Sequence, residues 1–327
     1  MTSETHRWPM GEVITRCKTL VFLAFIFYLS TALSSNAQTP RNENKPRDSS
    51  NTTSDATTAF EIASVRLSAP NTPLRTNFGL DSFEDSGHLN GIFRANTNLK
   101  SYIEFAFGLL DFHEQEESLR RTMPSWAFTN PLAIDARAEG NPTKDEVRRM
   151  VRTLLEERLR LKTHDEVKQL PVYELVLAAP GRFGAGLQVH RSENNCLQRT
   201  TPNLGPASKT KPSTLYCGDT AWQENDLLHL KTVNVSFKHF AELLTSLGAL
   251  QGDTEHQLIL DGTGLSERYD IELVFRFRAN ARVDAGPDAG GQTAIEAMRT
   301  QLGLKLVKRT EPVKLLVIDH VEKPTEN

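Results

Sequence analysis

Apolar and polar residues alternate in several stretches of the chain, as is typical of strands with one buried face. This pattern predicts strands at residues 60–67, 92–95, 132–138 and 269–277. Elsewhere apolar residues recur at intervals of three and four, which predicts helices with one apolar stripe. The clearest stripe, at residues 147–159, indicates a helix packed on a core.

Helix starts can be placed from side chains that accept hydrogen bonds from the first free amides of a helix. Asn96 or Thr97 is predicted to cap the first helix, and Ser236 is predicted to cap a later one. Residues 143–146 and 293–296 each begin with Thr and end with Glu, which is the pattern of a capping box.

The chain also aligns weakly with itself. Residues 92–100 match residues 230–238 at an offset of 138, and residues 171–177 match residues 312–318 at an offset of 141. Weak matches in the same order and at similar offsets indicate an internal repeat. The predicted fold is α+β, with two copies of a β-α-β-α-β-β unit.

Each copy is predicted to be closed by a β-hairpin. Its two strands would be residues 161–167 and 172–178 in the first copy, and residues 304–308 and 313–321 in the second. Pro171 is then expected at a strand start, where its missing N–H does little harm.

Composition and the repeat together predict the domain organisation. Residues 1–37 combine a basic start, a short apolar run and small residues at the end, which is the pattern of a secretory signal peptide. Residues 38–59 have almost no large apolar side chain and predict a flexible linker. The first α+β unit is expected at residues 60–180, a disulfide-closed loop at 181–225 and the second unit at 226–327.

This N-terminal pattern predicts export to the periplasm or the extracellular space. Cleavage would leave a mature chain with no stable membrane span. The alternative is an uncleaved N-terminal anchor, although the apolar run is shorter than the about 20 residues that a membrane-spanning helix needs.

Two cysteines, Cys196 and Cys217, remain beyond the signal segment. An oxidising compartment favours a disulfide between them, and the polar loop that they enclose has little else to hold it. Two free thiols or a partial metal site are the alternatives.

Net charge argues against two kinds of partner, and the local sequence motifs do not indicate catalysis. The formal net charge of −3 favours neither a nucleic-acid partner nor a polybasic membrane-surface protein. Residues 113–117, His-Glu-Gln-Glu-Glu, begin like a zinc-protease helix but end in Glu where the second histidine is needed. The glycines of residues 181–186 are in the wrong order for a dinucleotide loop, which favours a flexible loop instead. The sequence predicts no catalytic residue, no metal site and no cofactor.

Two tryptophans in predicted loops, Trp126 and Trp222, are candidates for a binding surface, because aromatic side chains often contact sugars or partner chains. The alternative is that they cover the edge of the core. The last predicted strand ends at Asp319-His320, which is either a carboxylate that orients an imidazole or a strand end that emerges into water.

Several segments carry a family resemblance: residues 60–66 (Phe-Glu-Ile-Ala-Ser-Val-Arg), residues 261–270, and above all the ending Ile-Asp-His-Val-Glu-Lys-Pro-Thr-Glu-Asn. From around residue 60 onward the chain resembles a large family of exported acidobacterial proteins of unknown function. Some members carry this module behind a membrane metallopeptidase of the antibiotic-sensor type, which implies a sensing or interaction role outside the cytoplasm. The family brings no established catalytic residues. Residues 179–186 replace its usual short Gly-Pro-Lys stretch.

Three functions follow as hypotheses. The leading one is a non-catalytic extracytoplasmic interaction or binding module for an unidentified protein or envelope component, because sheet edges can accept a partner strand. The second is a secreted or periplasmic hydrolase acting on cell-wall or extracellular polymer. The third is a small-molecule sensing domain.

Overall fold

The structure is a computed structural model of the 327-residue chain. It describes residues 59–69, 72–81, 88–191, 196–197, 211, 214, 216–224, 226–248, 256–276 and 291–325. The predicted signal peptide and all but the last residue of the predicted linker lie outside the described residues. The described residues belong to one compact unit, and their helices and sheets confirm the α+β class. Among the helices described, none is long and apolar enough to cross a membrane.

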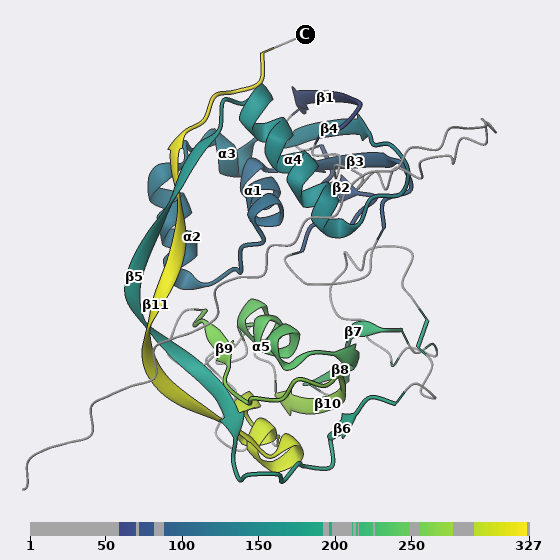
Figure 1. The fold of residues 1–327 in the computed structure, drawn as a ribbon, viewed down its shortest axis with the longest axis vertical. Coiled ribbons are helices and arrows are strands. Elements are labelled where there is room, and N and C mark those ends of the chain that lie inside the picture. Colours follow the sequence, from purple (N-terminus) through teal and green to yellow (C-terminus); the bar gives the residue numbers. More distant parts are fainter. Residues whose placement is uncertain are drawn as a thin grey trace, which may run out of the picture. The chain divides into compact units, whose positions relative to one another are not determined.

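The first sheet is antiparallel, with the strand order β1-β4-β3-β2 (Figure 1). Its strands are β1 (Ile62–Leu67), β2 (Arg75–Thr76), β3 (Ile92–Thr97) and β4 (Leu132–Arg137). Alternate strand residues are buried in one core together with the apolar stripes of α1 (Leu99–Phe107) and α4 (Lys144–Arg158). These helices therefore cover one face of the sheet, while the other face carries exposed side chains.

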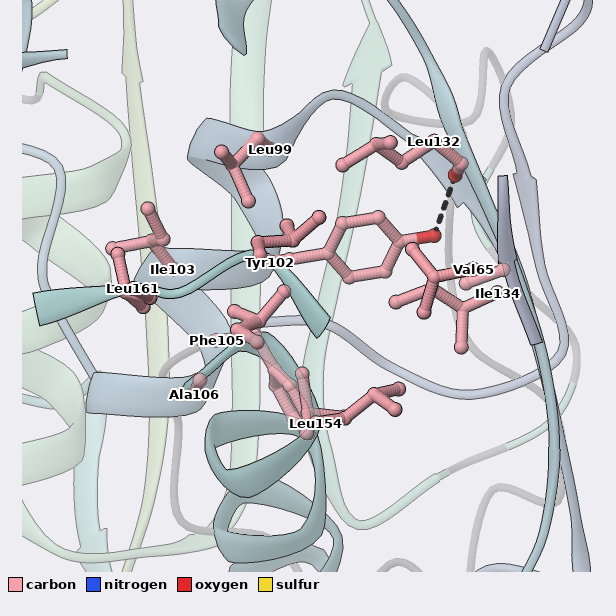
Figure 2. Packing of buried hydrophobic residues seen from close by; sticks show 14 of the residues in the cluster. Val65, Leu99, Tyr102, Ile103, Phe105, Ala106, Leu132, Ile134, Leu154 and Leu161 are labelled. Carbon is pink, nitrogen blue, oxygen red and sulfur yellow. Dashed lines mark hydrogen bonds between the residues drawn. The ribbon is translucent and has the colours of Figure 1, made fainter. Parts of the chain in front are cut away.

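Tyr102 of α1 lies at the centre of this core (Figure 2). Its side chain is fully buried, and its hydroxyl donates to the carbonyl oxygen of Leu132 at 2.9 Å. Burial raises the pKa of Tyr102 well above its usual range, so the hydroxyl stays a donor. This bond holds α1 against β4.

Local capping explains where the helices begin. The α1 cap is Asn98, whose side chain accepts from the backbone N–H of Ser101 at 2.9 Å. The predicted caps, one and two residues earlier, are therefore wrong. The predicted capping boxes that start at Thr143 and Thr293 are confirmed, and so is the cap at Ser236.

The second sheet is also antiparallel, with the order β6-β10-β8-β7. Its strands are β6 (Leu187–Val189), β7 (Gly218–Glu224), β8 (Leu227–Val235) and β10 (Tyr269–Arg276). A second core forms between this sheet, α5 (Phe237–Ser246), α6 (Ala294–Ala297) and the π-helical turn η1 (Met298–Leu302).

The two sheets have the same topology. If β6, β7, β8 and β10 are numbered one to four along the chain, as β1 to β4 are, both sheets have the strand order 1-4-3-2. In both sheets the strand before the capped helix is an inner strand, β3 before α1 and β8 before α5. The internal repeat stays a prediction, which these matching orders support.

The predicted closing hairpins are wrong. Each becomes a single long strand, β5 (Lys162–Leu177) and β11 (Leu304–His320), and the two pair with each other in antiparallel register from end to end (Figure 1). The physical reason is that residues 168–171, Lys-Gln-Leu-Pro, include no Gly, Asn or Asp to adopt the positive φ of a tight hairpin turn. The short strand β9 (Ile259–Asp261) extends this sheet in parallel beside β5.

Two prolines lie inside these long strands without breaking the pairing. Ala178 N–H donates to Gly303 O at 2.8 Å, which marks one directly bonded pair of residues. Every second residue of each strand from that pair onward is bonded to the partner strand. Pro171 and Pro312 lie between the bonded positions, so their backbone groups point away from the partner strand. Neither missing N–H therefore costs a ladder bond.

The outer edge of β11 is closed by side chains of α2 (His113–Thr122). Gln115 binds both backbone groups of Leu316: its amide nitrogen donates to the carbonyl at 3.2 Å, and its amide oxygen accepts from the N–H at 3.0 Å. Ser118 donates to the same carbonyl at 2.9 Å, and Thr122 accepts from Ile318 N–H at 3.3 Å. The α2 side chains thus take the place of a further strand.

A second glutamine does the same for the other sheet. Gln301 of η1 accepts from Val274 N–H at 2.9 Å and donates to Val274 O at 2.8 Å. Val274 lies beyond the part of β10 that pairs with β6. The edges of β10 and β11 are therefore both closed by a side-chain amide.

Candidate binding site

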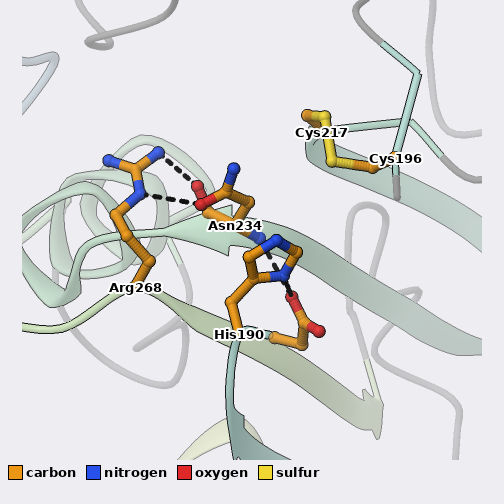
Figure 3. Close-up of a disulfide and its surroundings, with 6 residues drawn as sticks. His190, Cys196, Cys217, Asn234 and Arg268 are labelled. Carbon is orange, nitrogen blue, oxygen red and sulfur yellow. Dashed lines mark hydrogen bonds and ion pairs between the residues drawn. A yellow bond between two sulfur atoms is a disulfide. The ribbon is translucent and has the colours of Figure 1, made fainter. Parts of the chain in front are cut away.

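The structure contains a disulfide between Cys196 and Cys217, the two cysteines for which pairing is predicted (Figure 3). Their Cα atoms are 5.0 Å apart and 21 residues apart in sequence. Cys217 immediately precedes β7, so the bond ties the segment after β6 to the edge strand of the second sheet.

The two candidate tryptophans lie in different parts of the fold. Trp126 begins the short helix α3 (Trp126–Thr129) and packs, partly buried, against the first core. Trp222 is on β7, only 3% exposed, stacked on His229 at 4.9 Å between ring centroids and covered by Lys211. The structure does not bring the two rings together, and their binding role stays a prediction.

Asp319 and His320 at the end of β11 bind separate partners. Asp319 Oδ1 lies 2.8 Å from Nδ1 of His164 on β5, and His320 Nε2 lies 2.9 Å from a carboxylate oxygen of Glu322. All four side chains are about half exposed. The pair is thus not a carboxylate that orients its neighbouring imidazole.

A cluster of one lysine and three carboxylates joins α1 to α2. Lys100 Nζ lies 2.7 Å from Glu104, 3.0 Å from Glu116 and 3.8 Å from Asp111. Burial raises the pKa of Asp111, and a hydrogen bond with Glu116 raises it further against the attraction of Lys100. For Glu116 the same burial is outweighed by bonds from Lys100 and Asp111, which lower its pKa. The cluster therefore holds two neighbouring carboxyls whose proton affinities move in opposite directions.

Two histidine–aspartate pairs lie in the second half of the chain. His190 Nδ1 is 2.7 Å from Asp270 Oδ1, which also accepts from the backbone N–H of Asn234 at 3.0 Å (Figure 3). His239 Nε2 is 2.9 Å from both carboxylate oxygens of Asp219 and is 8% exposed. Among the described residues no Ser, Thr or Cys side chain is hydrogen-bonded to His190, so that pair lacks the nucleophile of a hydrolytic triad.

The zinc-protease-like residues 113–117 form the first turn of α2. Across the part of the chain that the structure describes, no group of three or more His, Cys, Asp or Glu side chains is placed to hold a metal ion. Glu114 and Glu116 instead lie near the positive end of the helix dipole, where acidic side chains stabilise a helix.

The outer edge of β1, unlike those of β10 and β11, is not closed by a side-chain amide from any described residue. Ser68 N–H donates to Pro131 O at 2.9 Å, so alternate residues before it direct their backbone groups toward β4. The backbone groups of Ala63, Val65 and Leu67 consequently point away from the sheet. No described residue is hydrogen-bonded to them. This edge can accept another strand.

A pocket lies beside the start of this edge. It has a volume of about 240 Å³ and is lined by residues 59–63 and, from α4, by Met150, Thr153, Leu154, Glu157 and Arg158. Ile62 at its rim is 72% exposed. Binding pockets for small molecules usually measure roughly 300–1,000 Å³, so this one is better suited to a single side chain.

Sequence reasoning predicted β1 as a strand but missed that it carries this site. Its alternating pattern is the same for an edge strand and an inner strand, because only one face of either is buried. The one available signal is Ile62, an apolar residue on the side of the strand that otherwise carries Ser64 and Arg66.

Comparisons with known proteins identify a family but no activity. Residues 100–321 match DUF3738, a family described as proteins of unknown function. No curated protein and no solved structure matches the chain. Since the match spans more than half of the 327 residues, the chain belongs to the DUF3738 family.

Proposed function

We propose that the exported, mature chain is a non-catalytic extracytoplasmic binding module that accepts an extended segment of a partner protein along the outer edge of β1. The observation that carries this proposal is the contrast between edges. β10 and β11 have their edges closed by Gln301 and Gln115, whereas three outward residues of β1 bind no described residue.

The pocket between β1 and α4 adds the means of selection. In strand addition the main-chain bonds supply affinity, and pockets for alternate side chains supply specificity. A partner strand paired with β1 would run past Ile62 and could place one side chain against Met150 and Leu154. Because Thr153, Glu157 and Arg158 line the pocket beside Met150 and Leu154, the expected anchor is a side chain with an apolar stem and a polar end.

The test is a proline at the edge. Ala63→Pro removes an outward N–H, leaves the bonds to β4 in place and puts a ring where the partner would pair. The matched control is Val189→Pro on the edge strand β6. The N–H of the next residue, His190, donates to Arg268 O, so the N–H of Val189 points away from β10. Both variants carry the same chemical change at a sheet edge.

Unstructured peptides of about 12 residues would be selected from a display library on the mature chain, since β-strands in proteins are mostly of that length or shorter. We expect Ala63→Pro to weaken the selected peptides at least about tenfold, because it removes a backbone bond and blocks the approach. Val189→Pro should leave binding unchanged, and hydrogen exchange at Ala63, Val65 and Leu67 should slow on binding. Equal binding by Ala63→Pro, or a library that yields no binder, would reject the proposal.

A second candidate is the polymer hydrolase, and one observation favours it. The carboxyls of Asp111 and Glu116 share a hydrogen bond beside Lys100, so one carboxyl can hold a proton while the other is ionised. Turnover of peptidoglycan or polysaccharide by the mature chain, abolished by Asp111→Asn, would support it. Absence of turnover would leave the cluster as a clamp between α1 and α2.

A further inference from the structure

The open face of the first sheet is rich in arginine. Strand pairing places ten side chains on this face, opposite the helices. Arg66, Arg75, Arg94 and Arg137 are all exposed there. We call these ten positions the arginine face; the other six are Ile62, Ser64, Ile92, Asn96, Ala133 and Asp135.

The charge of this face is largely uncompensated. Asp135 is its one acid, and it pairs with Arg94 at 3.3 Å. Within the described residues, no acid forms an ion pair with Arg66, Arg75 or Arg137. Four arginines against one aspartate give the face a charge of +3, although the whole chain has a net charge of −3.

The second sheet is an internal comparison with the same strand order. Its charged open-face positions are Glu224, Lys231, Asp270, Glu272 and Arg276, which sum to −1. The same face holds Trp222, buried beneath Lys211. Matching strand order thus does not by itself produce a basic face, and the arginines are particular to the first sheet.

Three of the arginines follow a diagonal across the strands. The diagonal runs from Arg137 on β4 through Arg94 on β3 to Arg75 on β2. Each step crosses to the neighbouring strand and moves two residues along it. With standard strand spacing, successive Cα atoms on this diagonal are about 8 Å apart. An extended chain lying along it would meet all three guanidinium groups.

We propose that the arginine face binds a linear polymer that carries carboxylates. Guanidinium groups pair with carboxylates through two parallel hydrogen bonds, and their weak hydration favours such pairs at interfaces. None of the ten positions holds an aromatic side chain, so the face lacks the stacking platform of neutral-sugar sites. Charge is therefore the means of recognition.

A narrow polymer fits the charge distribution better than a membrane does. An anionic bilayer would face the net negative remainder of the protein as well as the arginine face. A single chain meets only side chains within about 8–10 Å, the distance over which charges act at ordinary salt. The arginine face shares β1 with the proposed docking edge, but it uses open-face side chains where the edge uses backbone groups, so neither proposal depends on the other.

The test compares two triple variants of the full mature chain. Arg66→Gln, Arg75→Gln and Arg137→Gln remove the unpaired charge and spare the Arg94–Asp135 pair. The matched control removes equal charge elsewhere through Arg121→Gln, Arg149→Gln and Arg299→Gln, all at exposed positions. Circular dichroism would verify that both variants fold.

Binding to polygalacturonate, a linear polymer with one carboxylate per sugar, would be measured by calorimetry at two salt concentrations, with dextran as the neutral polymer. We expect wild type to bind polygalacturonate and not dextran, the face variant to lose at least about tenfold in affinity, and the control to change less than about twofold. Higher salt should weaken wild-type binding. Equal binding by the face variant, no binding by wild type, or stronger arginine-dependent binding to phosphatidylglycerol vesicles would overturn the proposal.

Discussion

Replacing Gln115 by methionine tests how much the two hydrogen bonds that close the edge of β11 contribute to the free energy of unfolding. Methionine has nearly the same length and volume, so packing is kept while both hydrogen bonds to Leu316 are lost. Gln115 and Leu316 are 2% and 4% exposed, and water cannot readily replace the amide.

The expected cost follows from the two backbone groups of Leu316. Its buried N–H loses its bond to Gln115, and an unsatisfied buried donor costs about 1–3 kcal/mol. Its carbonyl keeps Ser118 as a donor at 2.9 Å and loses about 1 kcal/mol at most. Gln115→Met should therefore lower the free energy of unfolding by about 1–4 kcal/mol. Ser118→Ala should cost about 1 kcal/mol, and the double variant should cost more than the sum because the carbonyl then has no partner.

The assay is urea unfolding of the mature chain, followed in parallel by tryptophan fluorescence and far-ultraviolet circular dichroism to verify a single transition. Gln223→Met on the exposed part of β7 is the control and should change stability by less than about 0.5 kcal/mol. A cost for Gln115→Met as small as that of the control would show that the amide does not replace a strand. Fast hydrogen exchange at the Leu316 amide in the variant would agree with the reasoning.

Three further predictions concern other parts of the fold. Burial alone would lower the pKa of His239, but the hydrogen bond and the charge of Asp219 raise it. The protonated His239–Asp219 pair therefore stabilises the fold fully below about pH 6.5, and this contribution is lost as pH rises through the raised pKa. In unfolding measured across pH, His239→Gln should remove that pH dependence, and an unchanged profile would contradict the prediction. Replacing Cys196 and Cys217 by serine should lower the free energy of unfolding by about 3 kcal/mol in the chain-entropy account, and wild type in reductant should match the variant. Gly184→Ala should cost more than about 1 kcal/mol, because its Cβ would lie 2.1 Å from a backbone carbonyl that cannot move freely, and a neutral effect in urea unfolding would refute this close packing.

Local features of the fold were readable from sequence, and long-range ones were not. Thr143 and Ser236 cap helices because their side chains bond amides three residues away, which a single sequence displays. The hairpin prediction failed at Pro171 and Pro312, because proline at a strand start and proline at an outward position of a long strand look alike in sequence. Gln115 was missed because a polar residue on a helix normally indicates a solvated face.

The candidate site shows the same division. Alternation at residues 62–67 predicts the strand, but strand order alone makes β1 an edge, and no local pattern encodes that order. The arginines of the open face lie in four strands spread over residues 66–137, and only the pairing register aligns them. Trp222 was singled out by its type, yet the structure covers its ring.

The pairing of β5 with β11 also sets the order in which the protein can fold. Leu316 and Ile318 belong to the core of the first sheet, and Leu316 meets Gln115 across a separation of 201 residues. The N-terminal half therefore cannot complete its core until the last strand has been made and delivered. Contacts so distant in sequence slow folding, because the entropy of closing the loop is lost before the contact forms. Late closure suits a chain that must cross a membrane unfolded, as the proposed export requires.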